Sequence, residues 1–360
     1  MKRIPQVVIT GGPGAGESSG ISFLAQKLAT SGYLVIPVHE SATEVFLDYG
    51  TTLSARAFQK RVLERIVTKE EAARQTALAL PASVRPIILC DRGIHDNAAY
   101  QERSAFERSL LVHSLCPLKD RDERYDAVIH LRTAALGAEE SYTIANNAAR
   151  RETLAEARAL DERTLGAWLG HPKLRVIANL AGEPFEHKLE RAWKALAQTL
   201  GIPTPLEIER RFLIQPGHEL LPLPVAHEIV HITQTYLSER KQRIRARSMY
   251  GKTIFTRAYK RTVRKGVREE IEEAIDEHEY RKLLVKRDPE RGTIIKDRVH
   301  FIWNNQHFEL DIFAQPKELA ILEIELSDEA EQVTLPPFLP IEREITHEKK
   351  YTNYRLSKWM

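Results

Sequence analysis

One stretch, Gly11-Gly-Pro-Gly-Ala-Gly-Glu-Ser18, decides the fold of the first half of the chain. It follows an apolar run, Gln6–Thr10, and opens a segment of helical period, Ser18–Ser31. A glycine-rich turn between a strand and a helix aims backbone N–H groups at phosphate oxygens, and a serine placed like Ser18 can ligate Mg²⁺. The stretch therefore predicts a phosphate-binding loop, with a tight turn that holds no ligand as the alternative. The candidate nucleotide-binding residues here are Gly11, Gly14, Gly16, Glu17, Ser18 and Ser19.

Glu17 departs from the pattern, because phosphate-binding loops of this spacing carry lysine at that position. Lysine neutralises the β- and γ-phosphates, whereas a carboxylate repels them. At ~4 Å and an effective dielectric constant of ~20, one unit charge is worth about 4 kcal/mol, and the exchange of lysine for glutamate is two units. The sequence thus supports the loop's fold more strongly than its activity.

The pattern around the loop is that of an α/β protein with a parallel sheet. Apolar runs that we expect to be strands buried on both faces alternate with segments of helical period. The predicted strands are Gln6–Thr10, Leu34–Val38, Pro86–Cys90, Tyr125–Leu131 and Leu174–Asn179, and the clearest predicted helices are Ser18–Ser31, Ala55–Leu80 and Arg151–Leu169.

Nearly all of residues 4–202 resemble P-loop nucleoside- and nucleotide-kinase-like NTPases, especially the kinase-like module often fused to a CYTH domain. Val38-His-Glu-Ser-Ala-Thr43 looks like that family's acidic turn, and Leu89-Cys-Asp-Arg-Gly-Ile-His-Asp96 looks like its Asp-Arg-Gly motif. The resemblance implies that Glu40 acts as a base or Mg²⁺ ligand, that Asp91 lies near the metal and that Arg92 lies near phosphate. Carboxylates that merely cap a strand end or a helix are the alternative for Glu40 and Asp91.

From Leu206 onward the apolar period changes to two, which is typical of antiparallel strands. Gly201-Ile-Pro-Thr-Pro205 lies at the change, so we expect domains at 1–203 and 204–360. Charged residues recur at i, i+2, which places them on one face of each strand. Nearly every strand contributes a single sign. The charged sets are Glu207, Glu209 and Arg211; Arg243, Arg245 and Arg247; Glu270 and Glu272; Lys296 and Arg298; Glu309 and Asp311; and Glu323 and Glu325.

An ordinary sheet with one solvated face is the simpler interpretation of this alternation. Segregation by sign favours another, in which carboxylates hold Mg²⁺ or Mn²⁺ and cations hold a polyanion. The pattern by itself leaves both interpretations open.

The order of these sets resembles the CYTH, or triphosphate tunnel metalloenzyme, family over about 150 residues. Glu207-Ile-Glu-Arg-Arg211 looks like its Glu-x-Glu-x-Lys signature, with arginine in place of lysine. The resemblance implies an α+β domain with an antiparallel β-tunnel that hydrolyses a triphosphate with Mg²⁺ or Mn²⁺. The implied metal ligands are Glu207, Glu209, Glu323 and Glu325, assisted by Asp311, Glu270 and Glu272. The implied triphosphate contacts are Arg211, Arg243, Arg245, Lys260, Lys296, Arg298 and Lys350. Among all of these, Glu207, Glu209, Arg211, Lys296 and Arg298 are the candidate catalytic residues.

The composition of the chain argues against several classes of function. The net charge of +3 and the absence of basic–aromatic runs argue against a nucleic-acid partner, including a 5′-triphosphorylated RNA. No apolar run reaches the roughly 20 residues of a membrane span, and two cysteines fit a cytoplasmic protein. We expect a triphosphatase acting on inorganic triphosphate or on a nucleoside or thiamine triphosphate. The alternatives are an adenylyl cyclase of the class IV type and a non-catalytic regulatory protein that binds nucleotide or polyphosphate.

Overall fold

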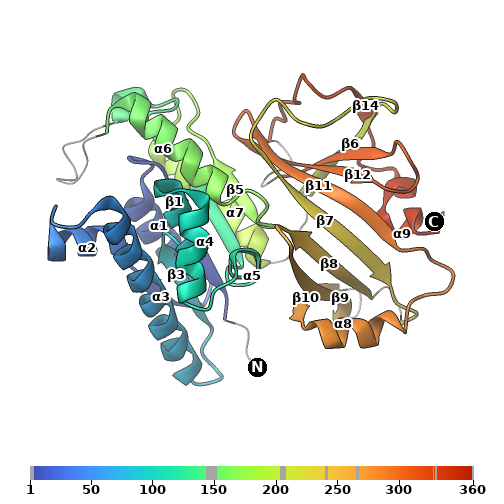
Figure 1. Ribbon diagram of the computed structural model, residues 1–360, viewed down its shortest axis with the longest axis horizontal. Coiled ribbons are helices and arrows are strands. Elements are labelled where there is room, and N and C mark those ends of the chain that lie inside the picture. The colour runs from blue at the N-terminus through green and yellow to red at the C-terminus, as the bar shows by residue number, and fades with distance from the viewer. Residues whose placement is uncertain are drawn as a thin grey trace. The chain divides into compact units, whose positions relative to one another are not determined.

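The chain forms two compact units, Met1–Leu206 and Glu207–Met360. The computed structural model describes residues 4–142, 152–202, 208–239, 242–264, 267–326, 328 and 331–358, without the side chains of 260–271. Both units are drawn in Figure 1. Among the helices that these residues form, none has the length and apolarity needed to cross a bilayer.

The first unit is built on a parallel sheet of five strands in the order β2-β3-β1-β4-β5. Apolar side chains of α1 and α7 pack with alternate residues of the central strands, such as Ile9 and Leu89, and form the core of one face. Helices α3 and α6 contact the same strands as well (Figure 1). The strands are β1 (Gln6–Gly11), β2 (Leu34–Val38), β3 (Pro86–Asp91), β4 (Ala127–Leu131) and β5 (Leu174–Ile177). The α-helices are α1 (Glu17–Thr30), α2 (Ser41–Tyr49), α3 (Ala55–Ala79), α4 (Arg103–Val112), α5 (Pro117–Asp122), α6 (Leu154–Ala167) and α7 (Phe185–Leu200). Two 3₁₀ helices complete the unit, η1 (Ile94–Tyr100) and η2 (Glu139–Ser141).

The α/β class and the parallel sheet predicted from the sequence are confirmed, and each predicted strand lies within three residues of its observed bounds. One expectation about burial is wrong. Strand β2 is an edge strand, and Leu34 at its start is 46% exposed, so this strand is not buried on both faces.

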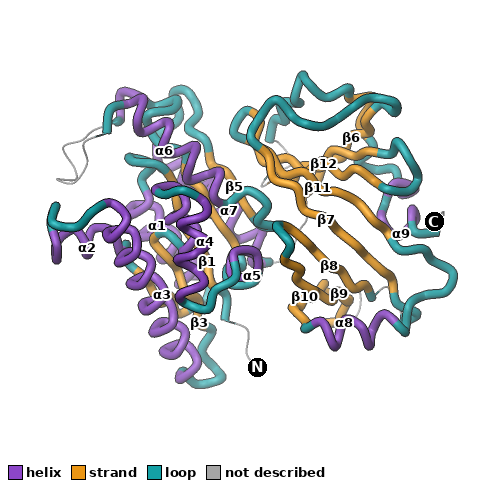
Figure 2. Tube along the Cα trace, viewed as in Figure 1, coloured by secondary structure: helices purple, strands orange, loops and turns teal. Residues whose placement is uncertain are grey.

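The second unit is a tunnel-like antiparallel sheet of nine strands in the order β10-β9-β8-β7-β11-β12-β13-β6-β14, and it confirms the predicted fold class (Figure 2). The strands are β6 (Ile208–Ile214), β7 (His227–Tyr236), β8 (Arg243–Met249), β9 (Lys252–Arg264), β10 (Val267–Ile275), β11 (Ile294–Trp303), β12 (Gln306–Phe313), β13 (Ala320–Leu326) and β14 (Ile341–Glu344). The helices are α8 (Glu277–Leu284), η3 (Lys349–Tyr351) and α9 (Asn353–Leu356).

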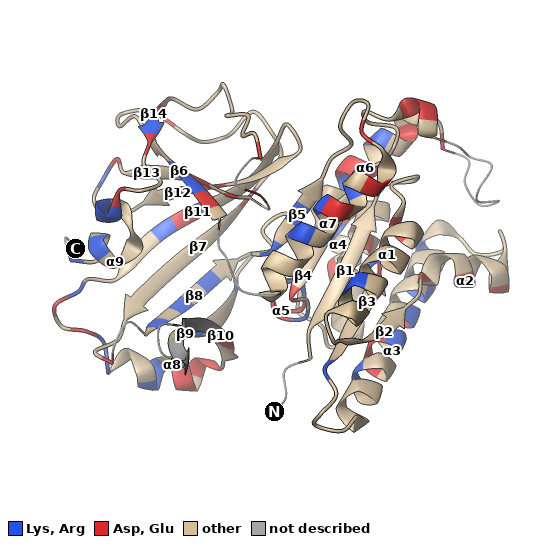
Figure 3. Ribbon diagram, turned by 180° about the vertical axis from the view of Figure 1, so that it is seen from behind, with Lys and Arg blue, Asp and Glu red and all other residues tan. Residues whose placement is uncertain are grey.

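The alternation of apolar and charged residues gives this sheet two different faces. One face buries a core that includes Phe212, Phe301, Phe308 and Leu322. Residues paired directly across antiparallel strands point to the same side. The pairs Arg298–Asp311, Glu309–Glu323 and Glu325–Glu209 therefore place these charged residues together on the opposite face. Bands of both charge signs cross β11 and its neighbours in Figure 3.

Candidate functional site

The glycine loop joins the end of β1 to the start of α1, as the sequence predicts. Gly16 is the N-cap of α1 with φ of 91°, and a Cβ there would lie 2.5 Å from Cζ of Phe185. Gly14 also has a positive φ, 76°. Positive φ and close approach both favour glycine. The loop therefore has the strand–turn–helix geometry that can bind an anion at the N-terminus of α1.

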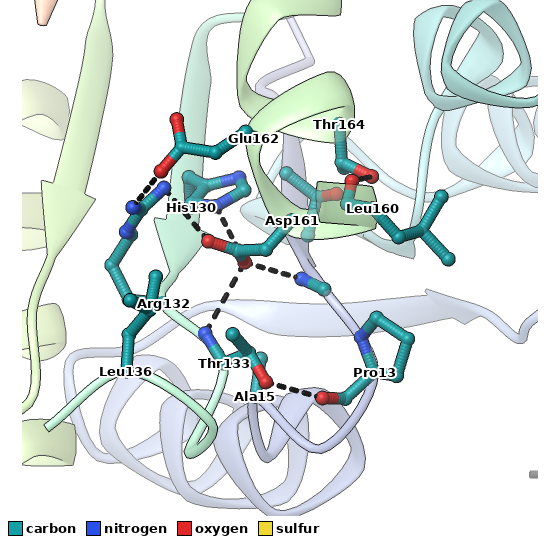
Figure 4. A network of polar contacts seen from close by, with 12 residues as sticks. Pro13, Ala15, His130, Arg132, Thr133, Leu136, Leu160, Asp161, Glu162 and Thr164 are labelled. Atoms are coloured by element: carbon teal, nitrogen blue, oxygen red, sulfur yellow. Dashed lines mark hydrogen bonds and ion pairs between the residues drawn. The ribbon is translucent and has the colours of Figure 1, made fainter. Parts of the chain in front are cut away.

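A buried carboxylate on α6 supports the loop (Figure 4). Oδ1 of Asp161 accepts hydrogen bonds from the backbone N–H groups of Gly12 at 2.7 Å and Thr133 at 3.2 Å. Nε2 of His130 lies 3.1 Å from Oδ1, and Nη1 of Arg132 lies 2.7 Å from Oδ2. Although burial opposes ionisation, His130, Arg132 and the Gly12 N–H lower the pKa of Asp161. Asp161 thus fixes the start of the loop against the end of β4 as an anion.

Lys188 on α7 fixes the end of the same loop. Its Nζ donates to the carbonyl oxygens of Ala15 at 3.2 Å and Arg132 at 2.6 Å. Burial lowers the pKa of Lys188 to about 8, although the charges of Glu17 and Asp161 act in the opposite direction. The side chain is 3% exposed, so it stabilises the loop from within the unit.

The structure places Glu17 against Arg92, one of the predicted phosphate contacts. Nη2 of Arg92 donates to Oε1 of Glu17 at 2.6 Å, and Nε of Arg92 lies 3.8 Å from Oε1 of Glu40. Burial and the charges of Glu17 and Glu40 raise the pKa of Asp91 to about 7. Glu17, Glu40, Asp91 and Arg92 therefore form one mixed-charge cluster beside the loop, whereas Ser18 is exposed at the start of α1. Ser19, the last predicted nucleotide-binding residue, is exposed as well.

In the second unit, Asp311 on β12 is the centre of the charged face. It is 0% exposed and pairs with Lys296 and Arg298 of β11, with Nε and Nη2 of Arg298 both 2.7 Å from its oxygens. Although burial opposes ionisation, Arg298 and Lys296 lower the pKa of Asp311 to about 2. Burial lowers the pKa of Lys296, against the pull of Asp311. Lys296 and Arg298 of the predicted cationic set thus pair with Asp311 of the predicted acidic set.

Arg298 extends this cluster to two more strands. Its Nη2 donates to Oε2 of Glu323 on β13 at 2.6 Å, and its Nη1 donates to Oε2 of Glu309 on β12. Burial and the charge of Asp311 raise the pKa of Glu323 to about 7, in spite of Arg298. The Glu323 carboxylate therefore lies between a cation, Arg298, and an anion, Asp311.

Two further carboxylates lie beside Glu323 on the same face. Glu325 of β13 is directly opposite Glu209 of β6, an arrangement of like charges that destabilises an antiparallel pair. Oε1 of Glu209 is 3.3 Å from Nε of Arg211. Carboxylate oxygens are the ligand type that suits Mg²⁺ or Mn²⁺, and the strand register places these three carboxylates on one face of the sheet.

A row of arginines follows β8 on the same side as Gln234 of β7. Arg245 donates from Nε and Nη2 to Oε1 of Gln234 at 3.2 and 3.0 Å, and its Nη1 lies 3.7 Å from Oε1 of Glu272. Burial and the neighbouring charge of Arg243 lower the pKa of Arg245 to about 10. Although burial opposes ionisation, Arg245 and Arg243 lower the pKa of Glu272 to about 2. Cations are therefore crowded here, which favours the approach of a polyanion.

Other predicted site residues have different surroundings. Arg211 is 6% exposed and donates to the carbonyl oxygens of Thr346 at 3.0 Å and Tyr351 at 3.4 Å, so it anchors the C-terminal segment. Lys350 is an exposed side chain 3.4 Å from Glu348. Glu207 and the side chains of Lys260 and Glu270 lie outside the described residues.

Several residues that shape these sites lie outside the motifs predicted from the sequence. Asp161 and Lys188 lie on helices far along the chain from the loop, and no local motif marks them. His300 and His307 lie beside Glu309 on the charged face, and a local signal does exist for them. Asn304 and Asn305 both have positive φ, as in a two-residue hairpin turn, and such a turn fixes the register that places His300 opposite Glu309.

Comparisons with known proteins give one family match and two similar solved structures. Residues 6–183 match the model of a family described as an AAA domain. Two solved structures are similar to the chain, one described as a hypothetical protein and the other as an inorganic triphosphatase. The first is 27% identical with a TM-score of 0.31, and the match covers 42% of this chain and 98% of that one. The second is 28% identical with a TM-score of 0.30, and the match covers 42% of this chain and 95% of that one. No curated protein matches the chain. The chain thus carries an AAA-type domain at residues 6–183, in addition to its nine-stranded antiparallel sheet.

Proposed function

We propose that the second unit is a metal-dependent triphosphatase whose active site is the charged face of the nine-stranded sheet. The observation that carries this proposal is the juxtaposition of Arg298 with Asp311 and Glu323, next to the opposed pair Glu209 and Glu325. The carboxylates of this face favour cations, and the arginines of β8 on the same side favour anions. A metal–triphosphate complex supplies both.

The chain's residues divide into two groups by their chemistry. Glu209, Glu323 and Glu325, together with Glu207, are the proposed ligands of Mg²⁺ or Mn²⁺, and Asp311 orients Lys296 and Arg298 beside them. A bound divalent ion would lower the pKa of a water molecule and polarise the terminal phosphoryl group. Lys296, Arg298, Arg243 and Arg245 would bind the phosphate oxygens and stabilise the charge that develops on them. Lys260, Glu270, Glu272, Arg211 and Lys350 are proposed as supporting residues of the same site.

The substrate we propose is inorganic triphosphate or a nucleoside or thiamine triphosphate. The test is phosphate release from inorganic triphosphate, ATP, GTP and thiamine triphosphate, each with Mg²⁺ and with Mn²⁺. We expect release from at least one of them, and loss of at least a hundredfold in rate for Glu209→Gln combined with Glu323→Gln. Formation of cyclic AMP and pyrophosphate from ATP would instead identify a cyclase.

A matched control distinguishes the effect of carboxylates on the charged face from the effect of removing negative charge elsewhere on the sheet. Glu273 is an exposed carboxylate on β10 whose neighbour in the chain is Glu272, so its side chain points to the other side of the sheet. Glu273→Gln should leave the rate unchanged. Full activity in the Glu209 and Glu323 variant, with an unchanged circular dichroism spectrum, would show that this face is not the active site.

For the first unit we propose nucleotide binding at the glycine loop, weakened by Glu17. The loop geometry favours an anion, whereas Glu17, Glu40 and Asp91 beside it disfavour one. Arg92 lies against two of these carboxylates, Glu17 and Glu40. This unit therefore acts in regulation or as a partner of the second unit more readily than as a kinase. Phosphate release at the wild-type rate in a Glu17→Gln variant, together with its loss in the Glu209 and Glu323 variant, would assign the hydrolysis to the second unit.

A further inference from the structure

We infer that His300, His307 and Glu309 form a site for a divalent transition-metal ion of the zinc class, separate from the proposed Mg²⁺ or Mn²⁺ ligands. His300 ends the series Lys296, Arg298, His300 on β11, and His307 and Glu309 lie on the paired strand β12. Their three ligand atoms lie within 4.8 Å of one another. The inference concerns metal binding by the free protein and does not depend on hydrolysis.

The distances between the ligand atoms fit such an ion. Nδ1 of His300 is 3.2 Å from Nε2 of His307 and 3.6 Å from Oε1 of Glu309. Tetrahedral zinc with bonds of about 2.1 Å holds its ligand atoms about 3.4 Å apart. A hydrogen bond between the two imidazoles also explains the first distance, but it does not explain why the Glu309 carboxylate lies within 4.8 Å of both nitrogens.

The surroundings hold the three side chains in position. His300 is 0% exposed, and its ring stacks on that of His307 with 5.3 Å between the centroids and 14° between the planes. Oε2 of Glu309 accepts a hydrogen bond from Arg298, so Oε1 is left directed towards the histidines. A site with restrained ligands loses little conformational entropy when it binds an ion.

The type of ligand atom decides which ion fits. Imidazole nitrogen suits zinc, nickel, copper and iron, whereas Mg²⁺ takes hard oxygen ligands and keeps its water. Three protein ligands leave at least one coordination position for water or a phosphate oxygen. Since Glu309 also pairs with Arg298, the ion would lie beside the residues that we propose for phosphate binding.

Equilibrium titration of the metal-free full-length protein with Co²⁺ tests this inference, because the visible absorption of Co²⁺ reports its ligands and geometry. We expect one Co²⁺ to bind with the absorption of a nitrogen- and oxygen-ligated site, Zn²⁺ to displace it, and a large excess of Mg²⁺ to leave it in place. His307 is only half-buried, and His307→Ala should weaken binding at least tenfold. Glu309→Gln should weaken it in the same direction.

His231→Ala is the matched control. His231 is an exposed histidine of β7 that contacts Asp297, the neighbour of Lys296 and Arg298 on the opposite face of β11. This variant should bind Co²⁺ as the wild type does. The inference is overturned if the wild type does not bind Co²⁺, if Mg²⁺ displaces it, or if His307→Ala and Glu309→Gln both retain wild-type affinity. If the wild type binds Co²⁺ but releases no phosphate from any of the four triphosphates, the proposed function is wrong and this metal site is unaffected.

Discussion

Exchange of Glu17 for lysine should have two opposite effects on the first unit. The substitution supplies the cation that a phosphate-binding loop normally carries, so the affinity for Mg²⁺–ATP should rise. It also removes the carboxylate that pairs with Arg92 at 2.6 Å, so the nucleotide-free protein should become less stable. Bound triphosphate should recover part of the lost stability, because its oxygens can replace the carboxylate.

The structure sets the size of both effects. The side chains of Arg92 and Glu17 are only 14% and 11% exposed, and breaking a buried ion pair costs about 3–5 kcal/mol. For the ligand, a charge reversal at ~4 Å changes the interaction by about 8 kcal/mol at an effective dielectric constant of ~20. Salt and solvent reduce this value. A gain of at least tenfold in affinity, about 1.4 kcal/mol, is therefore a conservative expectation.

The assay combines calorimetric titration of ATP with thermal unfolding of the full-length protein, each with Mg²⁺. Glu190→Lys is the matched control, since Glu190 is 45% exposed on α7 and pairs with Lys27 at 2.8 Å, away from the loop. That variant should change neither ATP affinity nor its effect on the melting temperature. If the wild type binds ATP as tightly as the Glu17→Lys variant, the electrostatic reasoning is wrong. If the wild type and the Glu17→Lys variant melt at the same temperature without nucleotide, the Glu17–Arg92 pair does not stabilise the unit.

Three further expectations follow from buried charges. Asp161→Asn leaves Arg132 without its closest buried anion and should lower the free energy of unfolding by about 3–5 kcal/mol in urea titrations; a change below ~1 kcal/mol would contradict the supporting role of Asp161. Burial lowers the pKa of Lys188 to about 8 in the folded protein, whereas the ordinary pKa of lysine is ~10.4. Between these two pH values the unfolded chain binds a proton at Lys188 and the folded chain does not. The free energy of unfolding gains a rising contribution with pH in that window, and Lys188→Met should remove it; equal slopes in both proteins would refute the assignment. Asp311→Asn should lower the free energy of unfolding by about 3–5 kcal/mol, because Arg298 and Lys296 lose the anion that they share. Thermal unfolding that matches the wild type would show that this pairing is dispensable.

Much of the fold could be predicted from the sequence, because periodicity is a local property. The apolar runs and helical segments before Leu200 predict the five strands of a parallel sheet, and the switch to a period of two predicts that the second sheet is antiparallel. The glycine loop could be located for the same reason, since a strand, a tight turn and a helix N-terminus are consecutive in the chain. The exposure of β2 could not be predicted, because an apolar run does not reveal which strand lies at the edge of the sheet.

For the candidate sites, the sequence identified which residues share a face and the structure decided what each one contacts. Alternation alone puts Lys296 and Arg298 on one side of a strand. It does not reveal that both of them pair with Asp311, nor that Arg211 binds backbone carbonyls. These outcomes depend on strand order and register, which the chain sets through contacts between distant segments.

The glycine loop shows the same division. The sequence by itself determined that Gly11-Gly-Pro-Gly-Ala-Gly-Glu-Ser18 is a turn between a strand and a helix, and that a carboxylate stands where lysine is usual. Only the tertiary structure decided how that carboxylate is compensated, by Arg92 from 75 positions further along the chain, and how Asp161 holds Gly12 from 149 positions away. The physical reason is that backbone conformation follows from neighbouring residues, whereas the partner of a buried charge is whichever group the packed fold brings within hydrogen-bonding distance.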